Sequence, residues 1–288
     1  MEGAKKMDGH KLKKTINGWE VFFSLVFVAV SVAMVIPFLY MVMMTFKEPI
    51  EIMRNPTAIL PRSFGYLENY KYILGPRYNI GTLYLNSTKI TFINVLAGLL
   101  TSATAGYAFA RLRFTGRDLI FLLYLSTLII PPQITIIPRF IIFNRLGLIN
   151  SHLSLILPGL FSIIGTFLLR QYFMQLPGEL AEAARIDGAG EYRTYWQIYL
   201  PLAVPALMSI LILNFSWHWN DYQSALIFLR SASKYTLPLG MNVFADINAD
   251  KIFFVATAGV MSILPVIVVF LAAQKYFITG LAAGAVKG

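Results

Sequence analysis

The chain has 288 residues, of which 57% are hydrophobic and only 13% are charged. Soluble domains carry about 25% charged residues, so the composition excludes an ordinary soluble fold. Lysine and arginine outnumber the acidic residues by 24 to 14, and the long apolar runs favour anionic lipid and membrane topology over nucleic acid as the reason. The chain has no cysteine, which excludes disulfides and thiolate metal sites, and its three histidines form no cluster that predicts a metal.

Six uncharged, mostly apolar runs are long enough to cross a bilayer, which requires about 20 residues. One such run alone is a common feature of a buried core, but six in one chain predict an all-α polytopic membrane protein with six transmembrane helices. The first run is too long for the apolar part of a signal peptide, and no small-residue cleavage site follows it. In chain order the runs are Val21–Phe46, Ile90–Ala110, Leu119–Pro138, Leu146–Leu169, Thr194–Asn220 and Ile252–Gln274.

Lysine and arginine in short loops indicate which side of the membrane a loop faces. Six spans place both termini on one side, and the lysine-rich N-terminal tail and the loop Arg111–Asp118 favour the cytoplasm. The segment Arg170–Arg193 would then be cytoplasmic, whereas Lys47–Lys89 and Asp221–Lys251 would form ordered caps outside. We expect cytoplasmic tails over 1–20 and 280–288, and between them a transmembrane domain over 21–279 with a cytoplasmic coupling loop at about 170–200.

Small residues and prolines within the runs predict close packing and bending. In the second run Gly98, Ser102 and Gly106 recur every four residues, which gives a face that another helix can approach closely. Prolines at membrane depth free backbone carbonyls that need neighbouring protein or cavity water. A bundle of bent helices with some internal water follows, as a transporter needs. The prolines are Pro131, Pro132, Pro158, Pro201, Pro205 and Pro265.

Residues 177–205 predict a short helix–turn–helix between two spans. Pro177 can open a helix, and Glu179 and Glu182 suit its positive end. Gly188 and Gly190 suit the left-handed positions that close a helix. A second helix is expected from Glu191 to Tyr199.

The exposed surface of this segment offers very few side-chain atoms. Small residues would let the walls of a partner protein close around the helix, and two carboxylates would orient it. The alternative is an ordinary solvated loop helix. The residues concerned are Glu182, Ala183, Ala184, Asp187, Gly188, Ala189 and Gly190.

The spacing of these residues is that of a known motif. The segment contains Glu182-Ala183-Ala184, then Asp187-Gly188-Ala189, then Ile198, Leu200-Pro201-Leu202 and Pro205. This arrangement resembles the EAA loop of ABC-importer permeases. A fixed pattern over more than twenty residues is highly specific.

The rest of the chain from Val21 onward is similar to the sugar-uptake branch of that family, which includes the smaller maltose-type permease. Gln223-Ser224-Ala225 departs from the pattern, since relatives often carry a proline there. The matching segments are Leu67-Glu68-Asn69-Tyr70, Asn86-Ser87, Gly106–Arg111, Trp219-Asn220-Asp221, Thr236–Gly240 and Gly280–Gly288.

The resemblance implies a transport subunit of a prokaryotic inner (cytoplasmic) membrane, multi-pass, and not an enzyme. Its implied partners are a second permease subunit that forms a heterodimer with this chain, two ATP-binding subunits that use ATP and Mg, and an extracytoplasmic solute-binding protein, all beside membrane lipid. The residues themselves agree, because the chain has no G-x-x-x-x-G-K-[ST] phosphate loop and no catalytic constellation. We expect this chain to bind no cofactor, no metal and no nucleic acid.

Polar residues within the runs are candidates for the translocation path, because sugars are bound by amide and hydroxyl hydrogen bonds and by aromatic rings. The alternative for each of them is a helix–helix hydrogen bond or a place in the interfacial aromatic belt. The candidates are Asn94, Gln133, Asn214, Ser216, Trp217, Trp219 and Asn220.

The leading interpretation is a permease subunit for an oligosaccharide or other sugar, which forms half of the translocation path and couples to the ATPase through Glu182–Gly190. One alternative is an ABC permease for a glycerophosphodiester or polyol. An ion-coupled secondary carrier is a different class, disfavoured because the six runs contain no Asp, Glu, Lys or Arg. A membrane-embedded enzyme is disfavoured by the missing catalytic groups.

Overall fold

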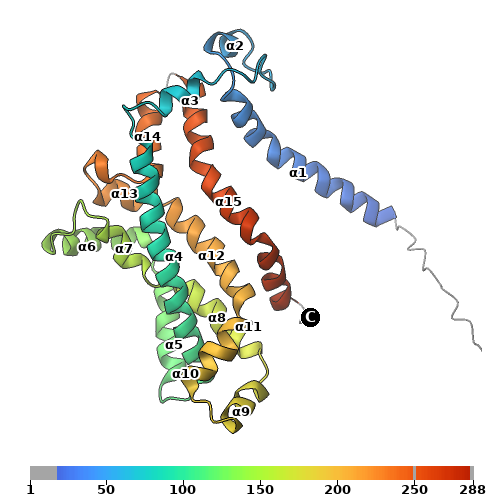
Figure 1. The fold of residues 1–288 in the computed structure, drawn as a ribbon, viewed down its shortest axis with the longest axis vertical. Helices are drawn as coiled ribbons and strands as arrows, with labels where there is room; N and C mark the ends of the chain where they lie inside the picture. Colours follow the sequence, from blue (N-terminus) through green and yellow to red (C-terminus); the bar gives the residue numbers. More distant parts are fainter. Residues whose placement is uncertain (1–17, 249–250, 286–288) are drawn as a thin grey trace, which may run out of the picture. The chain divides into compact units, whose positions relative to one another are not determined.

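The computed structural model describes residues 18–248 and 251–285, with side chains up to residue 275. Most of the predicted N-terminal tail (residues 1–17) and the end of the C-terminal tail (286–288) lie outside the described residues. Every regular element in the described ranges is a helix, which confirms the all-α prediction (Figure 1). The chain forms two compact units, one ending at Tyr66 and the other beginning at Leu67.

The first unit contains the first predicted span. Its helices are α1 (Gly18–Met44) and α2 (Pro49–Arg54). The apolar side chains of α1 are exposed along nearly its whole length, as expected for a helix that lipid or another protein covers. After α1, the Lys47 ammonium donates a hydrogen bond to the Ala58 carbonyl, and the buried Glu51 carboxylate accepts one from the Arg62 amide at 2.9 Å. These contacts order the segment that follows α1.

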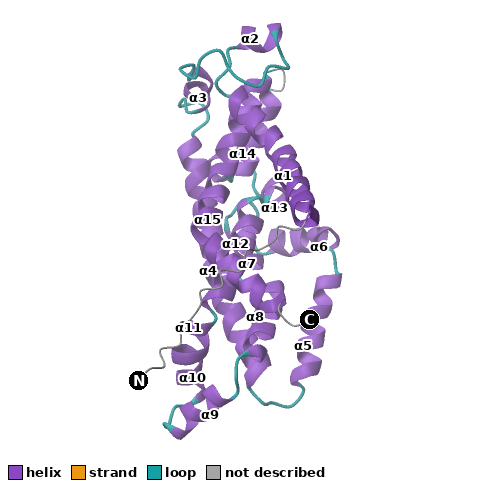
Figure 2. Cartoon of the chain, turned by 90° about the vertical axis from the view of Figure 1, so that its right-hand side faces the viewer, coloured by secondary structure: helices purple, strands orange, loops and turns teal. Residues whose placement is uncertain are grey.

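The second unit is a bundle around the long helix α4, against which α7, α8 and α12 pack, while α15 packs against α12 (Figure 1). Helices α9 and α14 lie at opposite ends of this unit (Figure 2). The elements are α3 (Glu68–Ile73), α4 (Ile80–Arg111), α5 (Arg117–Ser126), η1 (Thr127–Ile129), α6 (Pro132–Arg145), α7 (Leu153–Gly159), α8 (Ile163–Gln175), α9 (Glu179–Ile186), α10 (Glu191–Thr194), the π-helical η2 (Tyr195–Tyr199), α11 (Leu200–Leu202), α12 (Val204–Trp219), α13 (Tyr222–Phe228), η3 (Ala232–Lys234), α14 (Leu237–Ile247) and α15 (Ile252–Ala285).

Several predicted boundaries were wrong. Helix α4 begins ten residues before the predicted run, so that Lys89 lies on an exposed face of the helix and not in an outer loop. A lysine there ends an uncharged run without ending a helix, because its flexible stem can reach polar surroundings. At the other end, α15 continues to Ala285, beyond the predicted limit at Gln274.

The third and fifth predicted runs are bent. The chain turns by 96° between α5–η1 and α6, and by 74° between α10–α11 and α12. The first bend falls at Pro131-Pro132, where the missing amide hydrogens prevent the helix from continuing. Four helices of the described residues are long enough to cross a membrane, or six if each bent pair is one span.

The small-residue face of α4 packs directly on α8, as the four-residue spacing predicted. A Cβ atom on Gly106 would lie 2.9 Å from the Leu169 Cβ and 3.1 Å from the Arg170 amide nitrogen. Ser102 is fully buried, and its hydroxyl donates to the Ser162 carbonyl at 3.1 Å. The absence of side chains therefore sets the distance between α4 and α8.

We expect Gly106→Ala to lower the stability of the purified chain by about 1–3 kcal/mol, because the added methyl group forces α4 and α8 apart. Gly81→Ala is the matched control on the same helix, since no atom lies within 4 Å of its Cβ position. That control should be neutral or slightly stabilising, because alanine favours a helix over glycine. Thermal unfolding in detergent measures both, and equal midpoints for the two variants would contradict the packing.

Candidate functional site

The helix α9 ends in a Schellman motif built around Gly188. Gly188 has a φ of +75°, and its amide donates to the Arg185 carbonyl at 3.0 Å. The next amide, from Ala189, donates to the Ala184 carbonyl at 2.8 Å. This pair of bonds satisfies the carbonyls at the helix end and requires a left-handed residue, which glycine adopts without strain. The prediction for Gly188 is confirmed.

Gly190 does not share that conformation. Its φ of −74° and ψ of 167° are extended, and it is the N-cap residue of α10. The predicted helix Glu191–Tyr199 forms, but its second half is the π-helical η2. Two of the tyrosines there, Tyr195 and Tyr199, are buried against Tyr107 of α4, with ring centroids 5.0 and 5.3 Å from it. Residues 177–205, which we call the α9 segment, therefore pack on the bundle through their second helix.

One carboxylate anchors the segment to the bundle. Glu191 accepts a hydrogen bond from the Tyr107 hydroxyl at 3.0 Å and another from the Arg185 guanidinium at 2.7 Å. The second bond raises the pKa of the Arg185 guanidinium. Arg111, at the end of α4, donates to the Phe173 and Leu176 carbonyls at the end of α8. Sequence reasoning missed Tyr107, Arg111 and Glu191 as anchors, because their partners are distant in the chain.

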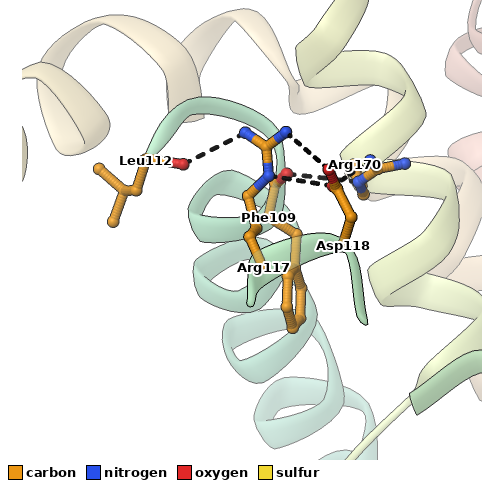
Figure 3. A network of polar contacts seen from close by, with 5 residues as sticks. All are labelled: Phe109, Leu112, Arg117, Asp118 and Arg170. Atoms are coloured by element: carbon orange, nitrogen blue, oxygen red, sulfur yellow. Dashed lines mark hydrogen bonds and ion pairs between the residues drawn. The ribbon is translucent and has the colours of Figure 1, made fainter. Parts of the chain in front are cut away.

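A second set of contacts ties the start of α5 and the end of α4 to α8 (Figure 3). The Asp118 carboxylate lies 3.6 Å from the Arg170 guanidinium and 3.1 Å from that of Arg117. Arg170 also donates to the Phe109 carbonyl at 3.3 Å. Its guanidinium stacks 4.1 Å from the centre of the Phe121 ring. Exposed ion pairs contribute little each, but Arg170 is largely buried, and its contacts hold the start of α5 and the end of α4 against α8.

The surface of the segment is only partly the one predicted. Of the residues expected to be exposed, Ala184 is buried, with 5% of its surface accessible, and Ala189 is half-buried. Two large side chains beside them are open instead, namely Ile186 at 87% and Tyr192 at 77%. These two side chains are therefore available to a partner protein, together with the exposed carboxylates of Glu182 and Asp187. The exposed predicted residues are Glu182, Ala183, Asp187, Gly188 and Gly190.

A cavity of about 800 Å³ lies in the second unit, between α6, α7, α12 and α13. Four of the predicted path residues line it, namely Gln133, Ser216, Trp217 and Asn220. The cavity volume is within the range of small-molecule sites. The bundle thus brings these four predicted path residues to one cavity, while their role in translocation stays a prediction.

The other three predicted path residues do not line this cavity. Asn94 is buried and donates to the Leu155 carbonyl at 3.2 Å, with its amide nitrogen 3.3 Å from the His218 Nδ1. Asn214 accepts from the Ser162 hydroxyl at 3.1 Å. The buried Trp219 indole donates to the Ser262 carbonyl at 3.0 Å. Each of the three makes a contact between helices, which is the alternative the sequence left open.

His218, another polar residue of the fifth predicted run, also lines the cavity, together with two charged residues that lie outside the predicted runs, Arg139 and Asp221. Arg139 had been placed in an outer loop because it ends an uncharged run. The sharp bend at Pro131-Pro132 changes this position, because helix α6 begins there and carries Arg139 to the cavity. Among residues 18–248 and 251–275, no group of three His, Asp or Glu side chains is suited to hold a metal ion.

Comparison with known proteins gives a consistent result. Residues 95–282 match the family described as "Binding-protein-dependent transport system inner membrane component". The chain is 37% identical to an arabinooligosaccharides transport system permease protein of Halalkalibacterium halodurans, over 91% of this chain and 94% of the relative. It is 35% identical to the sn-glycerol-3-phosphate transport system permease protein of Yersinia pestis, over 70% and 72% of the two chains.

A solved structure is similar over nearly the whole chain. It is the crystal structure of a bacterial ABC transporter involved in the import of the acidic polysaccharide alginate, and one of its chains superposes with a TM-score of 0.78. The sequence identity is 25%, over 91% of this chain and 99% of that one.

We expect Gly188→Ala to loosen the end of α9, because a left-handed alanine costs about 1–2 kcal/mol. Hydrogen exchange of the Ala189 amide should accelerate roughly five- to thirtyfold. Gly190→Ala is the matched control, since both glycines have open space at their Cβ positions and only Gly188 has a positive φ. If both variants exchanged the Ala189 amide at the same rate as the unmodified chain, the Schellman motif would not stabilise this segment.

Proposed function

The chain belongs to the family of binding-protein-dependent transport system inner membrane components, and from that premise we propose that it is the permease subunit of an ATP-driven importer for an oligosaccharide or other sugar. The observation that carries the proposal is that the family match over 95–282 includes both the exposed α9 segment and most of the helices that form the polar cavity. The similarity to an arabinooligosaccharide permease over 91% of the chain supports a saccharide as the transported solute.

In this proposal the chain works with three other subunits and a binding protein. A second permease subunit pairs with it as a heterodimer, and two ATP-binding subunits supply the energy with ATP and Mg. An extracytoplasmic solute-binding protein delivers the saccharide. The separate ATPase is supported by the chain's own sequence, which has no phosphate-binding loop.

The α9 segment is the proposed contact with an ATP-binding subunit. Ala183 and Gly188 permit close approach, while Glu182 and Asp187 meet basic or amide donors in a cleft of that subunit. The open Ile186 side chain, 87% exposed in the chain alone, would be covered by the partner.

A second candidate solute is a glycerophosphodiester or polyol. It is favoured by the 35% identity to a permease named for sn-glycerol-3-phosphate transport. The two candidates share the same subunit architecture and differ in the transported solute. Uptake by the assembled importer, with each class of solute on its own binding protein, separates them.

We expect Ala183→Trp to abolish uptake and weaken capture of the ATP-binding subunit, because the indole clashes with the walls of the cleft. Glu182→Ala should weaken that capture by roughly ten- to hundredfold, which corresponds to about 1.5–3 kcal/mol for a charge-assisted contact. Ala184→Trp is not a test of docking, because Ala184 is buried within the chain itself. The measurements are pull-down of the ATP-binding subunit by membrane-inserted permease and saccharide uptake into proteoliposomes.

Glu179→Ala is the matched control for this experiment, since it removes an exposed carboxylate from the first turn of the same helix. It should leave capture and uptake unchanged. Wild-type capture and uptake by both Ala183→Trp and Glu182→Ala would mean that α9 is a solvated helix without a docking role.

We further propose that α9 and both termini are cytoplasmic, in a prokaryotic cytoplasmic membrane. Single cysteines at Ile186 and Arg230 test this in a chain that has none of its own. Both positions are exposed; Ile186 is the last residue of α9, and Arg230 lies between α13 and η3. An impermeant thiol reagent added to intact cells should label position 230 and leave position 186 unlabelled until the membrane is opened, and the reverse pattern would invert the topology.

A further inference from the structure

The cavity between α6, α7, α12 and α13 carries two charged groups of opposite sign, Arg139 and Asp221, neither of which was among the predicted path residues. We propose that it is a subsite for a neutral saccharide ring, with Arg139 as hydrogen-bond donor, Asp221 as acceptor and the Trp217 indole as the apolar surface. This inference rests on the proposed transport of a saccharide and adds where on this subunit the sugar is held and by which chemistry.

Arg139 is positioned as a donor whose capacity is largely unused. Its guanidinium lies 4.8 Å from the centre of the Phe228 ring and donates to the Ser224 hydroxyl at 3.3 Å. The Nε atom is buried and has no hydrogen-bond partner. Within the described residues no carboxylate lies within ion-pair distance of Arg139. Because the Nε atom is itself buried, a ligand in the cavity meets only the terminal nitrogens of the guanidinium. The Nη1 atom makes no hydrogen bond to the described residues, so its N–H groups can bond the oxygen atoms of a ligand.

Asp221 supplies the complementary acceptor. One carboxylate oxygen, Oδ1, accepts from the Ser224 amide at 2.9 Å and so caps α13. Its second oxygen accepts no hydrogen bond from any described residue, and the side chain lines the same cavity as Arg139. Ser224 bonds both Arg139 and Asp221, which holds the two charged groups at one end of the cavity.

The remaining walls suit a sugar ring. Trp217 is 68% exposed and offers an aromatic face to the apolar C–H groups of a ring. The amides of Gln133 and Gln223 line the cavity and make no hydrogen bonds to the described residues. Planar donors and acceptors of this kind bond adjacent hydroxyl groups, and the cavity volume of about 800 Å³ is large enough for a small ligand.

The balance of charge selects the class of saccharide. Arg139 and Asp221 together add no net charge to the cavity, so a neutral sugar can bridge them through its hydroxyl groups. A carboxylated sugar would bond Arg139 but would bring a second negative charge close to Asp221, which disfavours it. The structure therefore indicates a neutral ring and not a uronate.

The test measures protection of a single cysteine in the assembled importer. Leu213→Cys places a thiol at the cavity without removing a proposed sugar contact, and alkylation of this otherwise cysteine-free chain is followed by mass spectrometry. Arabinotriose and raffinose are the neutral probes, and trigalacturonate is the acidic probe. We expect the neutral probes to slow alkylation, and trigalacturonate to have little effect.

Two variants and one control locate the contact. Arg139→Gln and Asp221→Asn should each raise the half-protecting concentration of the neutral probes by about tenfold or more. Asparagine retains the helix cap, so Asp221→Asn removes the charge without removing the start of α13. Arg145→Gln is the control, because Arg145 is an exposed arginine on the same helix α6 that does not line the cavity.

The outcomes separate this inference from the proposed function. Protection that is unchanged in both variants, protection by trigalacturonate alone, or a cysteine that a partner subunit already shields without sugar would each overturn the subsite. Saccharide uptake by the same complex, measured in parallel, would in those cases leave the proposed function intact. Uptake of a glycerophosphodiester with no uptake of any saccharide would overturn the sugar function itself.

Discussion

The close packing of α4 on α8 is the contact on which the rest of the second unit depends. Gly106 and Ser102 bring the two helix backbones together, and the same helix α4 then carries Tyr107 to Glu191 and Arg111 to the end of α8. In the other direction α4 carries Asn94, which bonds Leu155 in the cavity wall. A wider spacing would displace the anchors of both sites at once, because all of them are fixed to one rigid helix.

Helix α4 therefore links the cavity and the α9 segment physically. Asn94 and Tyr107 are thirteen positions apart, which corresponds to about 20 Å along a helix. Helix α12 provides a second link, since it begins after the α10–α11 bend and ends at Trp219, with Trp217 and His218 at the cavity. The Asn94–His218 contact joins these two helices beside the cavity.

The sequence predicted those features of the structure that depend on neighbouring residues in the chain. A glycine after an alanine-rich helix indicated the left-handed cap at Gly188, and a four-residue repeat of small residues indicated the α4 face. The sequence could not show that Ala184 points inward, because burial depends on what packs beside the segment. The Tyr107–Glu191 bond joins residues 84 positions apart and leaves no local pattern. Of the seven polar path candidates, four line the cavity, since amide and indole side chains serve equally well in helix–helix contacts.

The two bends account for where the functional groups lie. A broken helix at membrane depth exposes carbonyls and amides that only protein or internal water can satisfy, so breaks persist where the structure leaves a cavity or meets an aqueous surface. The bend at Pro131-Pro132 turns α6 across the bundle, and as a result Gln133 and Arg139 reach the cavity. The bend before α12 turns the chain from the α9 segment into the bundle. A straight third span would have left Arg139 in a loop, without the neighbours that give it a role. The two bends therefore lie next to the cavity and the α9 segment, and prolines in the sequence indicate both bends.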